Sequence, residues 1–292
     1  MDNGQTLGAG IGPSIAASLR LAGFFALIGI LIPVHTVYTI MRPSDSLRLP
    51  RLFHRLLVRL LGFHIRAHGV AASIRPALFV ANHSSYLDIP VLATLVPGAF
   101  VAKSEVASWP LFGFMAKLQN TLFIERRSAQ TRAQSESIQG RLAKGQNLIL
   151  FPEGTSSDGL DVLPFRSALF AALEEKQGAP RAIVQPISIT CTELDGLPIT
   201  RAWRPYYAWF GDMTLVGHLW NVFKVGRFTV DVVFHPPVTA AAFVDRKALA
   251  LHCQRQVAAG VQFCLSGRLT AATDPAKIAP PTTSRLANAP QG

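Results

Sequence analysis

Apolar and polar positions along this chain fall into three patterns, each of which predicts a different kind of element. The first is an uncharged apolar run from Leu21 to Met41, LAGFFALIGILIPVHTVYTIM. At the rise of an α-helix such a run is about 31 Å long, which is enough to cross a bilayer. Pro33 lies within it, so the helix is expected either to cross with a kink or to dip into the membrane without crossing. A cleaved signal peptide fits less well, because the run is long and no small-residue cleavage site closes it.

The second pattern is amphipathic and follows directly, in RLFHRLLVRLLGF from Arg51 to Phe63. Arg51, Arg55 and Arg59 recur every four residues, while leucines and phenylalanines form a wide apolar side. Two interpretations remain open. The helix either lies in the membrane interface with its arginines toward anionic headgroups, which the neighbouring apolar run favours, or packs on a domain as an ordinary amphipathic helix.

The third pattern, beyond residue 70, alternates short runs of Val, Ile and Phe with longer helical segments, and it predicts an α/β domain with a mixed sheet flanked by helices. The predicted strands are Ala77–Ala81, Ala99–Ala102, Thr121–Glu125, Asn147–Phe151, Ile183–Thr190 and Phe228–Phe234. The predicted helices are Ile89–Leu95, Pro110–Leu118, Ala129–Ala143, Phe165–Lys176 and Asp245–Leu265.

These patterns divide the chain into four parts. They are an N-terminal membrane segment (1–48), an amphipathic interfacial helix (49–69), an α/β domain (70–267) and a proline-rich tail (268–292) that is expected to be disordered.

Composition narrows the partners of this domain. The net charge of +11 at pH 7 favours polyanions, and a hydrophobic content of 49% favours a membrane surface over nucleic acid. No nucleic-acid-binding motif is present. The three cysteines fall in no disulfide or metal-ligand spacing. Arginines are more frequent after the apolar run than before it, so the positive-inside rule places the domain in the cytoplasm.

Candidate chemistry begins with FVANHSSYLDIP, Phe79 to Pro90, where a strand ends and a helix begins. His83 suits proton transfer there, and Asp88 either orients the histidine or caps the helix. A serine hydrolase is disfavoured, because no G-x-S-x-G sequence occurs. We therefore interpret the four serines of these turns as hydrogen-bonding residues. They are Ser84, Ser85, Ser156 and Ser157.

Two further strand ends carry polar groups. LILFPEGTSSDG, from Leu148 to Gly159, predicts a turn whose backbone amides can hold an anion, with Glu153 bonded to a neighbouring loop or to an acceptor hydroxyl. TLFIERR ends in Arg126 and Arg127, and arginine suits bidentate contact with a phosphate. The aromatic stretch WRPYYAWF, from Trp203 to Phe210, fits either the core or an acyl groove.

Four stretches in order resemble the motifs of the glycerolipid acyltransferases, the lysophosphatidate acyltransferase group: NHSSYLD, FIER, FPEGT and QPISI. The resemblance covers about residues 50 to 240. It implies a glycerol-phosphate-acyltransferase-like fold in which His83 is the general base and Asp88 orients it. The acceptor-binding residues it implies are Arg126, Glu153, Gly154, Thr155 and Ser156. Supporting positions are Asn82, Ser85, Phe123, Pro152 and Pro186.

The resemblance also implies the reaction. An acyl group moves from an acyl-carrier-protein or acyl-CoA thioester to the hydroxyl of a lysophospholipid, chiefly lysophosphatidate, with no metal or organic cofactor. It further implies a bacterial inner-membrane enzyme in contact with membrane lipids.

Departures from the motifs keep lyso-ornithine lipid as an alternative acceptor. Asn120 replaces a glycine, and Ser156 replaces an arginine. The stretches EGTSSDG, LPFRSALF and VVFHPPV are similar to bacterial lyso-ornithine lipid acyltransferases. Outside the enzymes, a non-catalytic membrane-binding module is the remaining alternative, although it has no use for His83 and Asp88.

Overall fold

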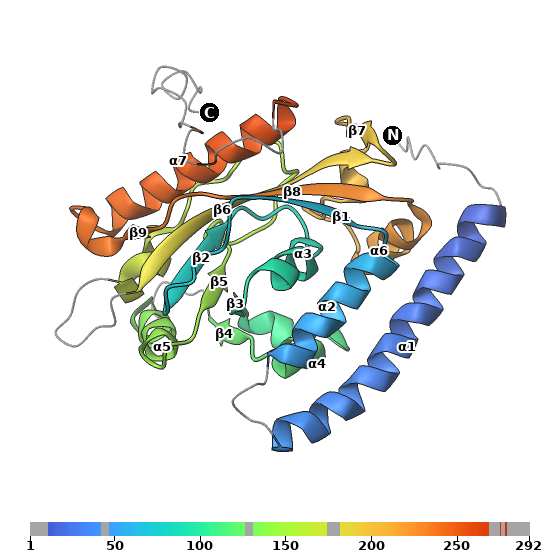
Figure 1. Cartoon of the computed structure of the whole chain (residues 1–292), viewed down its shortest axis with the longest axis horizontal. Coiled ribbons are helices and arrows are strands. Elements are labelled where there is room, and N and C mark those ends of the chain that lie inside the picture. The colour runs from blue at the N-terminus through green and yellow to red at the C-terminus, as the bar shows by residue number, and fades with distance from the viewer. Residues whose placement is uncertain are drawn as a thin grey trace.

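A mixed β-sheet forms the centre of the molecule, with helices on both of its faces (Figure 1). The computed structural model describes residues 11–41, 47–125, 131–173, 182–268, 275 and 278. Within these residues the sheet has nine strands, seven of them in the order β1-β8-β6-β2-β5-β3-β4. Strand β8 runs antiparallel to β6, whereas β6, β2, β5, β3 and β4 pair in parallel. The prediction of a mixed sheet flanked by helices is confirmed.

The strands match the predicted apolar runs closely. Their bounds are β1 His64–His68, β2 Ala77–Ala81, β3 Ala99–Lys103, β4 Leu122–Ile124, β5 Leu148–Leu150, β6 Ile183–Leu194, β7 Leu197–Pro198, β8 Phe228–Phe234 and β9 Val238–Thr239. The short β7 and β9 pair with β6. Strand β1 is missing from the predictions because its sequence HIRAH has no apolar run. Its pairing with buried β8 specifies it instead.

Both faces of the sheet are buried, as a parallel sheet requires. Side chains of β2 alternate between two cores: Phe79 packs with residues of α1, α2 and α3, while Leu78 and Val80 pack with residues of α5 and α7. Because the carboxyl ends of β2, β5, β3 and β4 lie along one edge, the loops that follow them meet there.

The α-helices are α1 Ile11–Met41, α2 Arg48–Leu60, α3 Asp88–Leu95, α4 Phe112–Leu118, α5 Thr131–Ala143, α6 Leu215–Lys224 and α7 Arg246–Leu265. The prediction of an α-helix over Phe165–Lys176 is wrong. The described part of this segment contains a 3₁₀-helix, Ser167–Leu173, which packs against both α5 and α7. Helix α6 was not predicted, although its apolar residues Leu215, Leu219, Val222 and Phe223 recur at helical spacing.

Helix α1 lies along one side of the domain, next to α2 and α6 (Figure 1). Ala17 and Phe24 are buried in this contact, and Arg20 donates hydrogen bonds to the carbonyls of Phe223 and Val225. Its other face exposes large apolar side chains. These include Ile15, Leu19, Phe25, Ile30, Val37 and Ile40. The segment Ser14–Met41 is long and apolar enough to cross a membrane, so α1 fits membrane association.

Helix α2 packs on the domain, which corrects the expectation that it lies in the membrane interface. His54, Leu57 and Val58 on its apolar side are buried, and Leu57 belongs to the core shared with α1 and α3. This side is therefore not free to lie in a membrane interface. Arg55 and Arg59 point outward and are exposed. The predicted boundary 49–69 is also wrong, because β1 belongs to the central sheet.

Two residues of the tail that was expected to be disordered are described, Pro275 and Ile278. Ile278 is buried against Val233, Ala259 and Cys264 on the α7 side of the sheet. Ile278 therefore packs on the domain.

Candidate active site

The turn between β2 and α3 brings the predicted pair together. His83 Nδ1 lies 3.0 Å from Asp88 Oδ2, and the same carboxylate oxygen accepts the backbone N–H groups of Ser84 at 2.7 Å and Ser85 at 2.9 Å. Asp88 is fully buried. It does not cap its own helix, because Leu87 occupies the N-cap position with no side-chain cap. The carboxylate thus closes the turn and faces the histidine.

This contact defines how His83 is oriented. A carboxylate beside Nδ1 makes that nitrogen the N–H donor and leaves the Nε2 lone pair free. The imidazole stacks on Phe151 with ring centroids 4.1 Å apart and 16° between the planes. Its side chain is 21% exposed and lines the large pocket described below. The free nitrogen is therefore available to a bound molecule.

Tyr207 is a site residue that the sequence did not reveal. Its hydroxyl donates a 2.9 Å hydrogen bond to Asp88 Oδ1, and its side chain is almost fully buried. Burial, with the Asp88 charge adding to it, raises the pKa of Tyr207 well above the usual 10, so the phenol stays a donor. Its separation from Asp88 along the chain left no pattern that could identify it.

Glu153 binds backbone amides on both of its oxygens. Oε1 accepts the N–H of His83 at 2.6 Å, and Oε2 accepts the N–H of Leu163 at 2.8 Å. Burial, with the charge of Asp88 adding to it, raises the pKa of Glu153 to about 7, against the lowering effect of the two N–H donors. Glu153 does not line the pocket, and its two bonds go to neighbouring loops, which is one of the two roles expected for it. Contact with an acceptor stays a prediction.

The loop after β5 forms the next part of the site. Gly154, Thr155 and Ser156 line the pocket, and Gly154 has a positive φ of +78° that favours glycine. Ser156 Oγ donates to the carbonyl of Trp209 at 2.5 Å. The N–H of Ser157 donates to the carbonyl of His83 at 3.0 Å. These bonds join the loop to the histidine turn.

The expected supporting residues stabilise the surrounding backbone. Asn82 Nδ2 donates to the carbonyl of Ile189 at 2.9 Å, and its Oδ1 accepts the N–H of Ile189 at 2.8 Å, which ties the end of β2 to β6. Ser85 Oγ accepts the N–H of Leu87 at 3.2 Å.

The other predicted residues belong to the sheet or to the loop after β5. Pro152 accepts the N–H of Arg166, Pro186 pairs with β2 inside the sheet, and Phe123 is part of β4. The predicted residues Arg126 and Arg127 lie outside the described residues.

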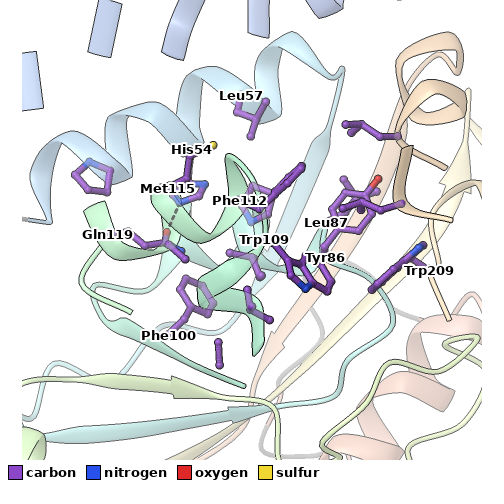
Figure 2. Close-up of a pocket in the computed structure, with 18 of the residues that line it drawn as sticks. His54, Leu57, Tyr86, Leu87, Phe100, Trp109, Phe112, Met115, Gln119 and Trp209 are labelled. Atoms are coloured by element: carbon purple, nitrogen blue, oxygen red, sulfur yellow. Dashed lines mark hydrogen bonds between the residues drawn. The ribbon is translucent and has the colours of Figure 1, made fainter. Parts of the chain in front are cut away.

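An apolar pocket of about 450 Å³ runs from His83 beneath α1 and α2 (Figure 2). Its walls include Phe24, Leu57, Phe100, Phe112 and Met115. Figure 2 shows His54 and Gln119 on one side, joined by a 2.7 Å hydrogen bond, and Trp209 on the other.

The aromatic stretch from Trp203 to Phe210 divides between the core and this pocket. Tyr207 is buried, whereas Trp209 and Phe210 line the pocket. The core interpretation is therefore confirmed for Tyr207, and the acyl groove stays a prediction for Trp209 and Phe210.

Metal-binding side chains are not grouped in the part of the chain that the structure describes. No set of three or more His, Cys, Asp or Glu residues there is placed to hold a metal ion. The cysteines Cys191, Cys253 and Cys264 are free and buried, and burial raises the pKa of each thiol.

Comparisons with known proteins identify the family of this chain. A model of the family described as Acyltransferase matches residues 64–190, which include the histidine turn and the loop after β5. A Brucella abortus protein named lyso-ornithine lipid O-acyltransferase is 41% identical over 259 residues, 87% of this chain and 97% of that protein. The chain therefore belongs to the acyltransferase family.

Other relatives extend this comparison. A lyso-ornithine lipid O-acyltransferase of Rhizobium meliloti is 41% identical over 225 residues, 76% of each chain. A Neisseria gonorrhoeae 1-acyl-sn-glycerol-3-phosphate acyltransferase is 36% identical over 177 residues, 59% of this chain and 64% of that one. The crystal structure of the Thermotoga maritima 1-acyl-sn-glycerophosphate acyltransferase has a similar fold, with a TM-score of 0.50 at 22% identity, covering 86% of this chain and 99% of that one.

Proposed function

We propose that this enzyme transfers a fatty acyl group from a thioester, carried by acyl carrier protein or coenzyme A, to the free hydroxyl of lyso-ornithine lipid. The observation that carries the proposal is the buried Asp88 carboxylate against Nδ1 of His83, at an apolar pocket. A thioester is already an activated acyl donor, so a positioned base is enough for the transfer to an alcohol.

The reaction follows from the orientation of the histidine. Nε2 of His83 takes the proton from the acceptor hydroxyl as its oxygen attacks the thioester carbonyl carbon. The new C–O bond forms, the C–S bond breaks, and the imidazolium returns the proton to the departing thiolate. Asp88 stabilises the imidazolium while it exists, and the backbone donors of Ser84 and Ser85 hold that carboxylate in place.

The acyl chain has a matching environment in the pocket. Its walls are mostly aromatic and aliphatic, and among the described lining residues Lys103 is the one Lys or Arg, with no Asp or Glu. Moving an acyl chain from water into this pocket is favourable by about 0.8 kcal/mol for each CH₂ group that is buried. Exclusion of water also protects the thioester from hydrolysis.

The choice of acceptor rests on two observations. Two relatives that are 41% identical, matched over 97% and 76% of their length, are named lyso-ornithine lipid O-acyltransferases. Ser156 places a hydroxyl on the pocket wall where the resemblance to the phosphate-recognising enzymes implies an arginine. Lysophosphatidate is the second candidate, supported by the relatives that are named for it.

The bare apolar face of α1 supports a location at a bilayer, and we propose the cytoplasmic side of a bacterial inner membrane. The arginines that follow α1 along the chain favour that orientation.

A panel of acceptors tests the proposed function. Purified protein in detergent is incubated with one labelled acyl-carrier-protein thioester and, separately, with lyso-ornithine lipid, lysophosphatidate or no acceptor. We expect the fastest transfer to lyso-ornithine lipid. Preferential acylation of lysophosphatidate would favour the second candidate. Release of free fatty acid without any acceptor, or no consumption of the thioester, would contradict acyl transfer.

A further inference from the structure

Three aromatic rings stand together on one side of the pocket, away from His54 and Gln119 (Figure 2). The rings of Trp109 and Trp209 have centroids 6.1 Å apart and are 85° from parallel. The rings of Tyr86 and Trp209 have centroids 5.9 Å apart and are 68° from parallel. Tyr86 and Trp109 thus each make an edge-to-face contact with Trp209, and we call these three pocket-lining residues the aromatic box.

Hydrogen bonds to the protein fix two of these walls. The Tyr86 hydroxyl lies 2.8 Å from Nδ1 of His218, a buried side chain. The indole N–H of Trp209 donates to the carbonyl of Met213 at 2.8 Å. Because these polar atoms already have partners within the protein, the rings offer a ligand chiefly their π faces. Burial lowers the pKa of His218 to about 4, so this neighbour is neutral at physiological pH.

The box adjoins the proposed reaction centre. Tyr86 belongs to the same turn as His83, and the backbone N–H of Trp209 donates to the carbonyl of Ser84 at 2.8 Å. The carbonyl of Trp209 accepts the hydroxyl of Ser156. The aromatic walls are therefore anchored to both loops that are expected to hold the acceptor.

In this pocket the aromatic faces are the groups that can attract a cation. No Asp or Glu is among the described residues that line it, so an ammonium there has no carboxylate partner from those residues. Faces of Trp and Tyr attract an ammonium through the ring quadrupole, most strongly where water is excluded. Ornithine is an amino acid whose side chain ends in a primary amine, which is protonated at neutral pH. A glycerophosphate headgroup has no such group.

We propose that Tyr86, Trp109 and Trp209 bind the side-chain ammonium of the acceptor headgroup by cation–π contact and so select an amino-acid lipid over a phosphate lipid. The inference rests on the proposed function, since it concerns the acceptor of that reaction. The competing role for the same rings is to pack on an alkyl chain, which needs no charge on the headgroup.

The test compares two acceptors that differ only in the side-chain amine. One is lyso-ornithine lipid, and the other is its norvaline analogue, in which hydrogen replaces the side-chain amine. The measured quantity is the ratio of kcat/KM for the first acceptor to that for the second. We expect a wild-type ratio of about ten, the scale of a partly desolvated cation–π contact.

Variants of the box then report the origin of that ratio. Trp109→Leu and Trp209→Leu remove a π face but keep an apolar side chain, and each is expected to bring the ratio close to one. Trp109→Phe keeps a weaker face and is expected to give an intermediate ratio. Trp203→Leu is the matched control, because Trp203 packs on the core outside the pocket lining, and it is expected to keep the wild-type ratio.

Each outcome bears on a different claim. A wild-type ratio near one, which requires no variant to fold, would overturn the aromatic box while leaving transfer to lyso-ornithine lipid intact. A ratio that stays near ten in both leucine variants would also overturn it. Wild-type transfer to lysophosphatidate with none to either amino-acid lipid would contradict the proposed acceptor, and the inference with it.

Discussion

At the scale of residues, the position of the Asp88 carboxylate decides whether His83 has a partner that orients it. An aspartate ahead of an Ile-Pro pair is a good helix cap, and the sequence leaves that possibility open beside a pairing with His83. The structure settles the position of the carboxylate because the chain doubles back between the two residues. Two backbone N–H groups and the Tyr207 hydroxyl then converge on it from the protein side. Sequence spacing cannot report such a convergence, because Tyr207 comes from a distant loop.

Tyr207→Phe tests whether Asp88 needs that third donor. We expect kcat to fall about tenfold, because a hydrogen bond to a charged group contributes about 1.5–3 kcal/mol and the two backbone donors remain. The KM for the acceptor should stay within about twofold of wild type, since Tyr207 does not line the pocket. Initial rates over a range of acceptor concentrations separate these quantities. An unchanged kcat with a raised KM would assign Tyr207 to binding.

Glu153 predicts a pH dependence of stability. With a folded-state pKa of about 7 against an ordinary 4.5, folded Glu153 keeps a proton that the unfolded chain has already released between these pH values. The free energy of unfolding therefore falls as pH rises from about 4.5 to 7, and becomes independent of Glu153 outside this window. Glu153→Gln removes this slope. Urea unfolding of both proteins in detergent at pH 5 and pH 7.5 measures the difference, and parallel pH profiles would show that Glu153 does not titrate in this range.

Ser156→Arg tests the residue that separates the two candidate acceptors. The added guanidinium lies on the pocket wall and suits a phosphate, so the rate ratio of lysophosphatidate to lyso-ornithine lipid should rise about tenfold. Ser157→Arg is the matched control, because it adds the same charge one residue away, outside the pocket lining. Equal effects of the two variants would mean that general charge, and not Ser156, sets the preference.

At the scale of elements, the apolar runs predicted most strands and helices because burial on both faces of the sheet leaves a strong signal in sequence. The exceptions depend on tertiary contacts. Strand β1 is polar and edge-lying, and the 3₁₀-helix Ser167–Leu173 is helical in composition but is confined between α5 and α7. For the amphipathic α2 the membrane interface was favoured over packing on the domain, yet its apolar side covers the pocket. Periodicity identifies an apolar face without identifying what covers it.

At the scale of elements, we predict that the exposed face of α1 binds the membrane. Ile30 and Val37 lie on its outer face with 64% and 58% of their surface exposed. Replacing both by lysine should lower binding to lipid vesicles about tenfold or more, because a charge in the bilayer costs about 2.5–3.5 kcal/mol. Activity toward detergent-dispersed acceptor should stay within about twofold of wild type. Substitution is a cleaner test than deletion, because Phe24 of α1 is part of the pocket wall.

Vesicle flotation provides the measurement for this prediction. The double variant Val244→Lys, Leu251→Lys is its control, since both residues are exposed and Leu251 lies on α7, which packs on the other core of the sheet. If the α1 variant floated with vesicles as well as the control did, the bare face of α1 would not be the membrane contact.

In the whole molecule, one edge of the sheet carries the polar groups of the histidine turn and of the loop after β5. Helices α1 and α2 cover the apolar pocket beside it. The motifs predicted which loops meet at that edge, because the carboxyl ends of neighbouring parallel strands share one side. They did not predict the pocket, since its walls come from three separate stretches of sequence: the consecutive helices α1 and α2, helix α4, and the loop after β7. Helix α1 links the proposed membrane contact to the pocket. Its exposed apolar face is proposed to contact the bilayer, and its other face covers the space in which the acyl chain is expected to lie.

The central claim is that His83 is the general base of an acyl transfer, and the rate of His83→Ala tests it most directly. Purified wild type, His83→Ala and the control His64→Ala, which changes an exposed histidine of β1, are compared in detergent with a labelled thioester and lyso-ornithine lipid. Loss of a positioned base costs about a hundredfold to ten-thousandfold in rate, so we expect at least a hundredfold loss in His83→Ala, with an unchanged circular dichroism spectrum and wild-type rates in the control. A folded His83→Ala enzyme that kept more than about a tenth of the wild-type rate would contradict the mechanism, because too little of the barrier would then depend on this histidine.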